Sequence, residues 1–444
     1  MNGMGRWQTR SVSSLVVWMG AVGLILTTSG VVRADETNLA SDKADLQVLK
    51  ARLDKLEKKI VDQEAAAPAS SNPGGAFLQI PSGLQGVQMS GFVDTSIGYN
   101  FGAPQARTNT LRAFDTQSQS FMINNAELNL QKPVSADSRF GFKTSLMFGT
   151  DATVVGGVTT GLGTGTEQVE LKDAYTEYLV PIGEGLDVMA GKFATLHGAE
   201  VIESMNDWNF SRSYLFGFAI PFTHTGVRAT YPWTKWLSTT VGFNNGWDIV
   251  NDNNFGKTLE TEVTITPNDK MSLTTNYMVG PEQTTSATQP ATAGLGSNSH
   301  MRHLIDVVAS YQPIDPLQLK ANFDYGFEQK GVGIGENASW IGLAGYARYA
   351  LTDRWALASR VEWFHDADGV RTAFRPSGAG LNGISGFDLN LWEMTFTNEF
   401  KINKHLTSRL EYRHDQANEK IFRNEDKGNR PYQDTVALEF IAPF

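Results

Sequence analysis

The chain has 444 residues, of which 43 are glycine, 11% are aromatic and none is cysteine. The absence of cysteine excludes a disulfide framework and thiolate metal sites. The formal net charge of −10 argues against a nucleic-acid partner, because such affinity comes from Lys and Arg that neutralise phosphate. Abundant glycine and aromatic residues suit a membrane barrel with aromatic girdles.

We expect residues 1–34 to be a cleaved signal peptide. Arg6 and Arg10 precede an apolar run over residues 15–26, and the small residue Ala34 marks the expected cleavage site. The run has about 12 residues, whereas a membrane-spanning helix needs about 20, which disfavours a transmembrane helix. The peptide carries three arginines and no acid, so its removal lowers the net charge from −10 to −13.

Residues 35–64 form a segment of a different kind, in which charged residues separate apolar residues at heptad spacing. The apolar positions are Leu39, Leu46, Leu49, Leu53, Leu56 and Ile60. The spacing predicts a short periplasmic coiled coil over residues 39–64. The alternative is a single amphipathic helix that lies against another surface. Residues 65–86, rich in Ala, Pro, Ser and Gly, are predicted to be a flexible linker.

From residue 87 to residue 444 the sequence predicts an all-β outer-membrane barrel of a Gram-negative bacterium, in contact with membrane lipid. Sixteen candidate strands follow one another, an even number as a closed bacterial barrel requires. They are expected near residues 87–102, 119–132, 138–149, 168–180, 186–195, 222–232, 236–247, 256–266, 270–280, 300–312, 316–328, 338–352, 355–366, 386–402, 404–416 and 432–444.

The connections between these strands alternate in length. Short turns such as 133–137 and 313–315 alternate with long connections such as 103–118, 150–167 and 196–221. An antiparallel barrel with periplasmic turns at one rim and extracellular loops at the other produces this alternation.

Apolar and polar residues alternate along many of the candidate strands. Val361 and Trp363 are expected to face lipid, while Arg360 and Glu362 face the lumen. A charge on the lipid face at the bilayer midplane costs about 2–4 kcal/mol, so these charges must point inward. The last residue, Phe444, is expected on the lipid face, where a terminal aromatic residue resembles the signal that outer-membrane assembly machinery reads.

Several motifs resemble those of the OmpL-like β-barrel porin family. They are Ser90-Gly91-Phe92-Val93-Asp94, Asn125-Ala126-Glu127-Leu128, Gly191-Lys192-Phe193, Gly198 with Glu200, Ser211-Arg212-Ser213, Ala219-Ile220-Pro221-Phe222, His224-Thr225-Gly226-Val227-Arg228 and Gly246-Trp247-Asp248. The resemblance covers residues 87–444. It implies an outer-membrane barrel with a pore-forming role and without defined catalytic residues.

The long connection after the fifth strand is the main candidate site. This long connection resembles the inward-folded constriction loop of general porins, which follows the same strand, and that likeness implies a similar constriction here. The acids Glu200, Glu203 and Asp207 would line one side of it. The other side would carry lumen bases, namely Arg212, Arg228, Lys320, Arg360 and Arg409. Opposed charges would screen solutes by size and charge. The alternative is that ion pairs only pin the loop to the wall.

No sequence pattern points to a metal, a cofactor or catalysis. His300 and His303 are three positions apart, which places them on opposite faces of a strand. No Ser/His/Asp set stands out among the expected lumen or rim positions, so we predict that the protein is not an enzyme.

Two functions follow from these expectations. The first is an outer-membrane porin, a water-filled and weakly cation-selective channel for passive diffusion of small hydrophilic solutes or ions, assembled as a homotrimer. The alternative is a structural protein whose coiled coil tethers the membrane to a periplasmic partner or to peptidoglycan.

Overall fold

The computed structural model describes residues 86–158, 168–283, 298–332, 336–372, 388–425 and 428–444. The predicted signal peptide, the coiled-coil segment and the linker before residue 86 lie outside these described residues and stay predictions. In the described part of the chain, no helix is both long and apolar enough to cross a membrane.

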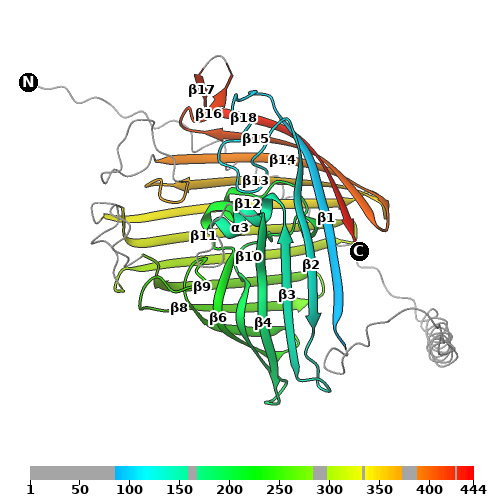
Figure 1. The fold of residues 1–444 in the computed structure, drawn as a ribbon, viewed down its shortest axis with the longest axis vertical. Helices are drawn as coiled ribbons and strands as arrows, with labels where there is room; N and C mark the ends of the chain where they lie inside the picture. The colour runs from blue at the N-terminus through cyan, green and yellow to red at the C-terminus, as the bar shows by residue number, and fades with distance from the viewer. Residues whose placement is uncertain (1–85, 159–167, 284–297, 333–335, 373–387, 426–427) are drawn as a thin grey trace, which may run out of the picture. The chain divides into compact units, whose positions relative to one another are not determined.

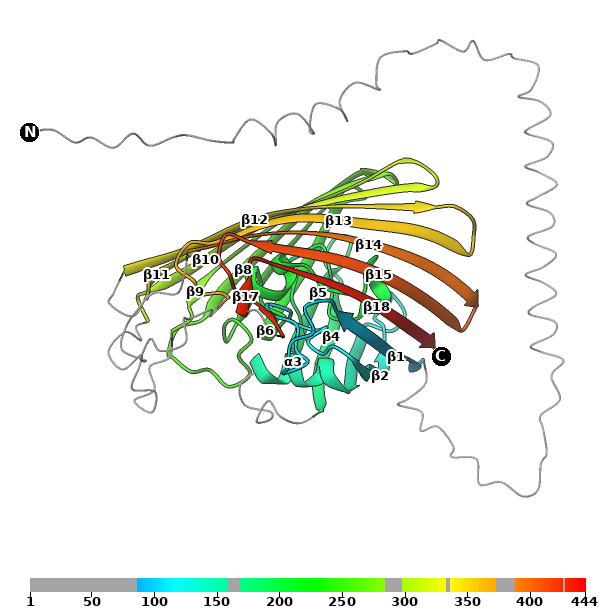
Figure 2. The ribbon, with the colours of Figure 1, turned by 90° about the horizontal axis from the view of Figure 1, so that it is seen from above.

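The described residues form a closed antiparallel barrel of sixteen strands (Figure 1, Figure 2). The first eight are β1 (Gln88–Asn100), β2 (Ser120–Lys132), β3 (Phe140–Phe148), β4 (Val169–Val180), β5 (Leu186–Ala194), β6 (Thr223–Thr234), β7 (Leu237–Asn244) and β8 (Thr258–Asn268). The last eight are β9 (Met271–Pro281), β10 (Met301–Ile314), β11 (Leu317–Val332), β12 (Glu336–Ala350), β13 (Trp355–Asp366), β14 (Leu389–Asn403), β15 (Leu406–Ala417) and β18 (Tyr432–Pro443). The predicted fold class and strand number are confirmed.

The alternation of side chains along the strands sorts them between lipid and lumen as predicted. Val361 and Trp363 on β13 are 56% and 37% exposed, whereas Arg360 and Glu362 between them are 0% and 1% exposed. Successive side chains of a strand point to opposite faces of the sheet. An apolar outer face and a polar inner face are what a barrel needs when lipid surrounds it.

The barrel closes where the last residue of the chain meets β1, and Figure 2 shows β1 and β18 side by side. The amide of Gly91 donates to the carbonyl of Phe444 at 3.0 Å, and the amide of Phe444 donates back at 2.9 Å. A Cβ atom at Gly91 would lie 2.5 Å from the Phe444 ring, so only glycine fits there. The Phe444 side chain is 64% exposed, and its recognition by assembly machinery stays a prediction.

Three long connections contain regular structure that the sequence did not predict. An α-helix, α3 (Thr150–Val158), lies in one of them, and a two-stranded hairpin of β16 (Phe422–Asn424) and β17 (Gly428–Arg430) lies in another. The third, between β5 and β6, contains two short helical turns, η2 (Ser204–Asn206) and the π-helical η3 (Leu215–Ala219). The sequence of α3 is rich in Thr, Val and Gly, which have poor helix propensity, so local pattern does not reveal it.

Candidate functional site

The connection from β5 to β6, residues 195–222, folds against the inner wall of the barrel, and we call it the inner segment. The amide of Ala199 donates to Oδ1 of Asn322 on β11 at 3.1 Å. The indole N–H of Trp340 on β12 donates to the carbonyl of Ala219 at 3.0 Å. The inner segment therefore crosses from its root at β5 to strands that lie across the barrel from it.

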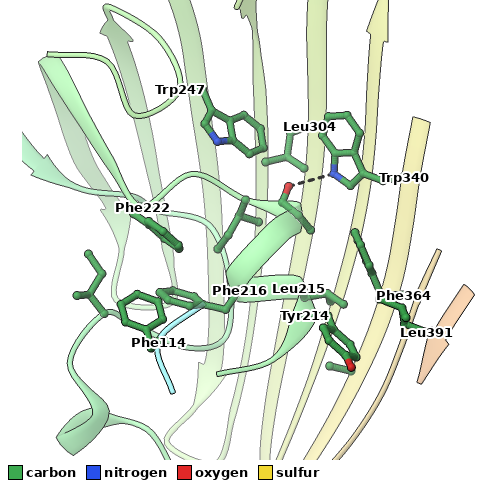
Figure 3. Packing of buried hydrophobic residues seen from close by; sticks show 14 of the residues in the cluster. Phe114, Tyr214, Leu215, Phe216, Phe222, Trp247, Leu304, Trp340, Phe364 and Leu391 are labelled. Atoms are coloured by element: carbon green, nitrogen blue, oxygen red, sulfur yellow. Dashed lines mark hydrogen bonds between the residues drawn. The ribbon is translucent and has the colours of Figure 1, made fainter. Parts of the chain in front are cut away.

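An apolar cluster joins the inner segment to the wall, as Figure 3 shows. Leu215 and Phe216 of η3 are buried together with inward-facing side chains of the wall strands, including Leu304, Trp340 and Phe364. Burying one such side chain stabilises a fold by about 1.5–3 kcal/mol. This cluster was not predicted, because the inner face of the barrel was expected to be polar throughout.

Two buried carboxylates of the wall hold backbone amides of the inner segment. Glu362 accepts hydrogen bonds from the amides of Tyr214 and Leu215, both at 2.6 Å, where η3 begins. Glu411 accepts hydrogen bonds from two earlier amides, those of Phe210 at 2.7 Å and Ser211 at 2.9 Å. The first amides of a helix have no partner within it, and a carboxylate there also meets the positive end of the helix dipole. These acids satisfy donors that would otherwise be buried without a partner.

Arginines of the wall hold carbonyl groups of the same segment. Arg409 donates to the carbonyls of Ser204 at 2.8 Å and Asp207 at 2.7 Å. Arg413 donates to the carbonyl of Arg212 at 2.6 Å. The inward parity of Glu362, Glu411 and Arg413 is readable from the sequence, but their backbone partners are not.

The three acids predicted to line a constriction are each paired directly with a base. Glu200 Oε1 lies 2.7 Å from the Arg360 guanidinium, and Asp207 lies 3.2 Å from Nε of Arg212. Glu203 forms an ion pair with Lys172 on β4. Glu203 is the most accessible of the three acids, with 17% of its side chain exposed. The structure thus brings acids and bases together as contacting pairs.

These contacts set the ionisation of the acids in the inner segment. Burial opposes ionisation of Glu200, but the Arg360 guanidinium and the hydrogen bonds from Ser213 outweigh it and hold the pKa of Glu200 below its ordinary value. Burial raises the pKa of Asp207 to about 7, although Arg212 favours its ionised form. Glu200 therefore keeps its charge at neutral pH, and Asp207 titrates close to it.

The remaining two predicted bases lie apart from these pairs. Arg228 on β6 pairs with Glu260 on β8 at 2.8 Å and donates to the carbonyl of Ala194 at 3.3 Å, beside the root of the inner segment. Lys320 on β11 contacts the inner segment from the other side. Its Nζ lies 3.4 Å from the carbonyl of Ala199 and 4.6 Å from the centre of the Trp208 ring.

The described residues contain no group of three or more His, Cys, Asp or Glu that could hold a metal ion. His303 instead forms a hydrogen bond with the hydroxyl of Tyr277 at 2.8 Å. What the site offers chemically is therefore a set of paired charges and hydrogen-bonding groups inside a barrel.

A closed sixteen-stranded barrel with an apolar outer face, a charged inner face and a long segment folded inside defines an outer-membrane barrel of the porin class. The chain belongs to the family described as Putative beta-barrel porin-2, OmpL-like, whose model matches residues 86–444. It is a multi-pass β-barrel of the outer membrane, as predicted.

Solved structures that include a porin and an outer membrane protein share this fold. An anion-selective porin from Comamonas acidovorans is 10% identical, with a TM-score of 0.55, and the match covers 81% of this chain and 99% of that one. OprB of Pseudomonas putida is 13% identical, with a TM-score of 0.54 and coverage of 81% and 94%. The trimer form of OmpT of Vibrio cholerae is 11% identical, with a TM-score of 0.52 and coverage of 81% and 99%. No curated protein matches the chain.

Proposed function

We propose that the protein is an outer-membrane porin, a water-filled channel through which small hydrophilic solutes or ions diffuse passively. The observation that carries this proposal is the inner segment, anchored by buried charges inside a barrel of sixteen strands. Barrels of 16 to 18 strands are wide enough to leave an aqueous channel. The inner segment would narrow that channel after β5. No catalytic chemistry is part of the proposal.

Planar-bilayer recording on the purified mature protein tests this function. We expect discrete conductance steps that scale with salt concentration, because ions would cross an aqueous path. Folded protein is recognised on gels by a shift in migration on boiling, since a closed barrel has no edge from which to unfold. Folded protein without conductance would contradict the channel and favour the tethering alternative.

The three acids of the inner segment are predicted to favour cations. Changing Glu200, Glu203 and Asp207 together to amides (E200Q, E203Q, D207N) should shift the reversal potential towards anions. The reason is that the change removes negative charge beside bases such as Arg360, which makes the net charge inside the barrel more positive. Reversal potentials in a salt gradient measure this.

The control for charge alone is Glu184→Gln, since Glu184 is exposed in the turn between β4 and β5. If E184Q shifts the potential as much as the triple variant does, these acids do not line a constriction.

The barrel is predicted to assemble as a homotrimer in the membrane. Its shortest wall strand, β7, has 8 residues, whereas a strand needs about 9–11 residues to span the bilayer. Strand β5, two positions along the wall from β7, has 9 residues. Where the strands are too short to span the bilayer, a second subunit covers the barrel surface better than lipid does. The OmpT structure similar to this chain is also a trimer form.

Light scattering in detergent tests the trimer and the role of residues 39–64. We expect a trimer for the mature protein and a lower mass when residues 39–64 are deleted, because a heptad segment on each chain would add weak pairing at high effective concentration. A monomeric mature protein would refute the trimer. A trimer that survives the deletion would assign its stability to the barrel walls.

A further inference from the structure

A cavity of about 310 Å³ lies on the inner face of the barrel, between the inner segment and the turn from β8 to β9. Trp208 of the inner segment and Lys320 of β11 form part of its lining. The other lining groups that bear on its chemistry are Asp269 and Lys270 in the turn, and Ser310 and Gln312 on β10. Its volume is at the lower end of the range for sites that bind small molecules.

Lys320 differs from the other bases that the sequence pointed to. Arg212, Arg228, Arg360 and Arg409 each have a carboxylate within 4.0 Å. Among the described residues, no carboxylate lies that close to Nζ of Lys320. An ammonium group has three N–H donors, and the carbonyl of Ala199 at 3.4 Å takes at most one of them. At most two donors therefore remain for a ligand in the cavity, since the ammonium also lies over the Trp208 ring.

The adjacent side chains define what that ligand would be. The Lys320 ammonium lies over one face of the Trp208 indole, 4.6 Å from the ring centre, and the same indole gives the cavity an apolar lining group beside the charge. With Lys270 and Asp269 included, the charged lining residues are two lysines and one aspartate, a net charge of one. Such a lining matches a ligand with one negative charge better than a phosphate with two.

We propose that this cavity is a solute-binding subsite for small aromatic or ring-bearing monocarboxylates. The carboxylate would accept hydrogen bonds from Lys320, and the ring would contact the Trp208 indole beside the ammonium. The inference rests on the proposed channel function, because the cavity lies on the inner face of the barrel. A single local site of this kind is compatible with weak cation selectivity, which reflects the field of the whole lumen.

Calorimetric titration of the full-length protein in detergent with benzoate and with benzamide tests the subsite. The two probes have the same ring, but only benzoate is charged. We expect benzoate to bind about tenfold more tightly, which is the range of a charge-assisted hydrogen bond. Lys320→Gln should weaken benzoate binding about tenfold and leave benzamide binding unchanged, whereas Trp208→Ala should weaken both.

Lys404→Gln is the matched control, since Lys404 is exposed in the turn between β14 and β15, and it should change neither affinity. Equal benzoate affinity of K320Q and the unmodified protein would overturn the proposal, as would equal affinities for benzoate and benzamide. The titration requires no ion flux, so its result is separate from the channel test. Benzoate binding with no conductance would uphold the subsite and refute the channel, and conductance without benzoate binding would refute the subsite alone.

Discussion

Replacing residues 197–220 of the inner segment with a four-residue Gly-Ser linker should raise the single-channel conductance about threefold or more. The segment crosses the inside of a barrel whose strand number otherwise leaves an open aqueous channel. The replacement is sterically feasible, because Ala194 and Thr223 at the two ends are direct partners in the ladder between β5 and β6. The wall strands would keep all their ladder hydrogen bonds.

The control for this experiment shortens another long connection between wall strands and leaves the inner segment unchanged. Deleting residues 424–429 shortens the hairpin of β16 and β17, which is a separate two-stranded sheet, and should leave the conductance near its original value. Both variants must show the gel shift of a folded barrel. An unchanged conductance in the folded linker variant would mean that the inner segment is not the constriction.

Most of the barrel could be predicted because its strands are defined by residues that lie close together in the sequence. Alternation of side chains at period two and the polar turns between strands place all sixteen strands, with ends that differ from the structure by at most four residues, as at the end of β11. The inward direction of Arg360 and Glu362 follows from the same parity. These features need no knowledge of which strands become neighbours.

The contacts of the inner segment could not be predicted in the same way. Glu200 and Arg360 are 160 positions apart in the sequence, and they meet only because the barrel closes and the segment folds inside it. Parity assigns Arg360 to the lumen, and the likeness to an inward-folded porin loop assigns Glu200 to it, but neither pairs the two residues. The apolar cluster around Trp340 could not be predicted either, because an apolar residue at an inward position only interrupts the expected alternation of apolar and polar residues. Whether the paired charges of the segment line a constriction stays a prediction.

Arg360→Met is expected to destabilise the barrel by about 3–5 kcal/mol, the cost of removing one partner from a buried ion pair. The Arg360 guanidinium donates to Glu393 and Glu200, both at 2.7 Å, and to the carbonyl of Ser211 at 2.5 Å. With methionine in its place, Glu200 would stay buried without its ion-pair partner, and Glu393 would keep only Arg413, whose Nε lies 3.6 Å away. The midpoint of unfolding in urea, followed by tryptophan fluorescence of the refolded protein, measures the loss.

The comparison that isolates burial is Arg348→Met. Arg348 also pairs with a carboxylate, Glu399 at 2.8 Å, but 20% of its side chain is exposed. A solvent-accessible pair contributes about 0–1 kcal/mol, so R348M should cost much less than R360M. Adding Glu200→Gln to Arg360→Met should recover part of the loss, because it removes the buried charge that has lost its ion-pair partner. If R360M lowers the free energy of unfolding no more than R348M does, the Arg360 guanidinium does not stabilise the barrel by anchoring the inner segment.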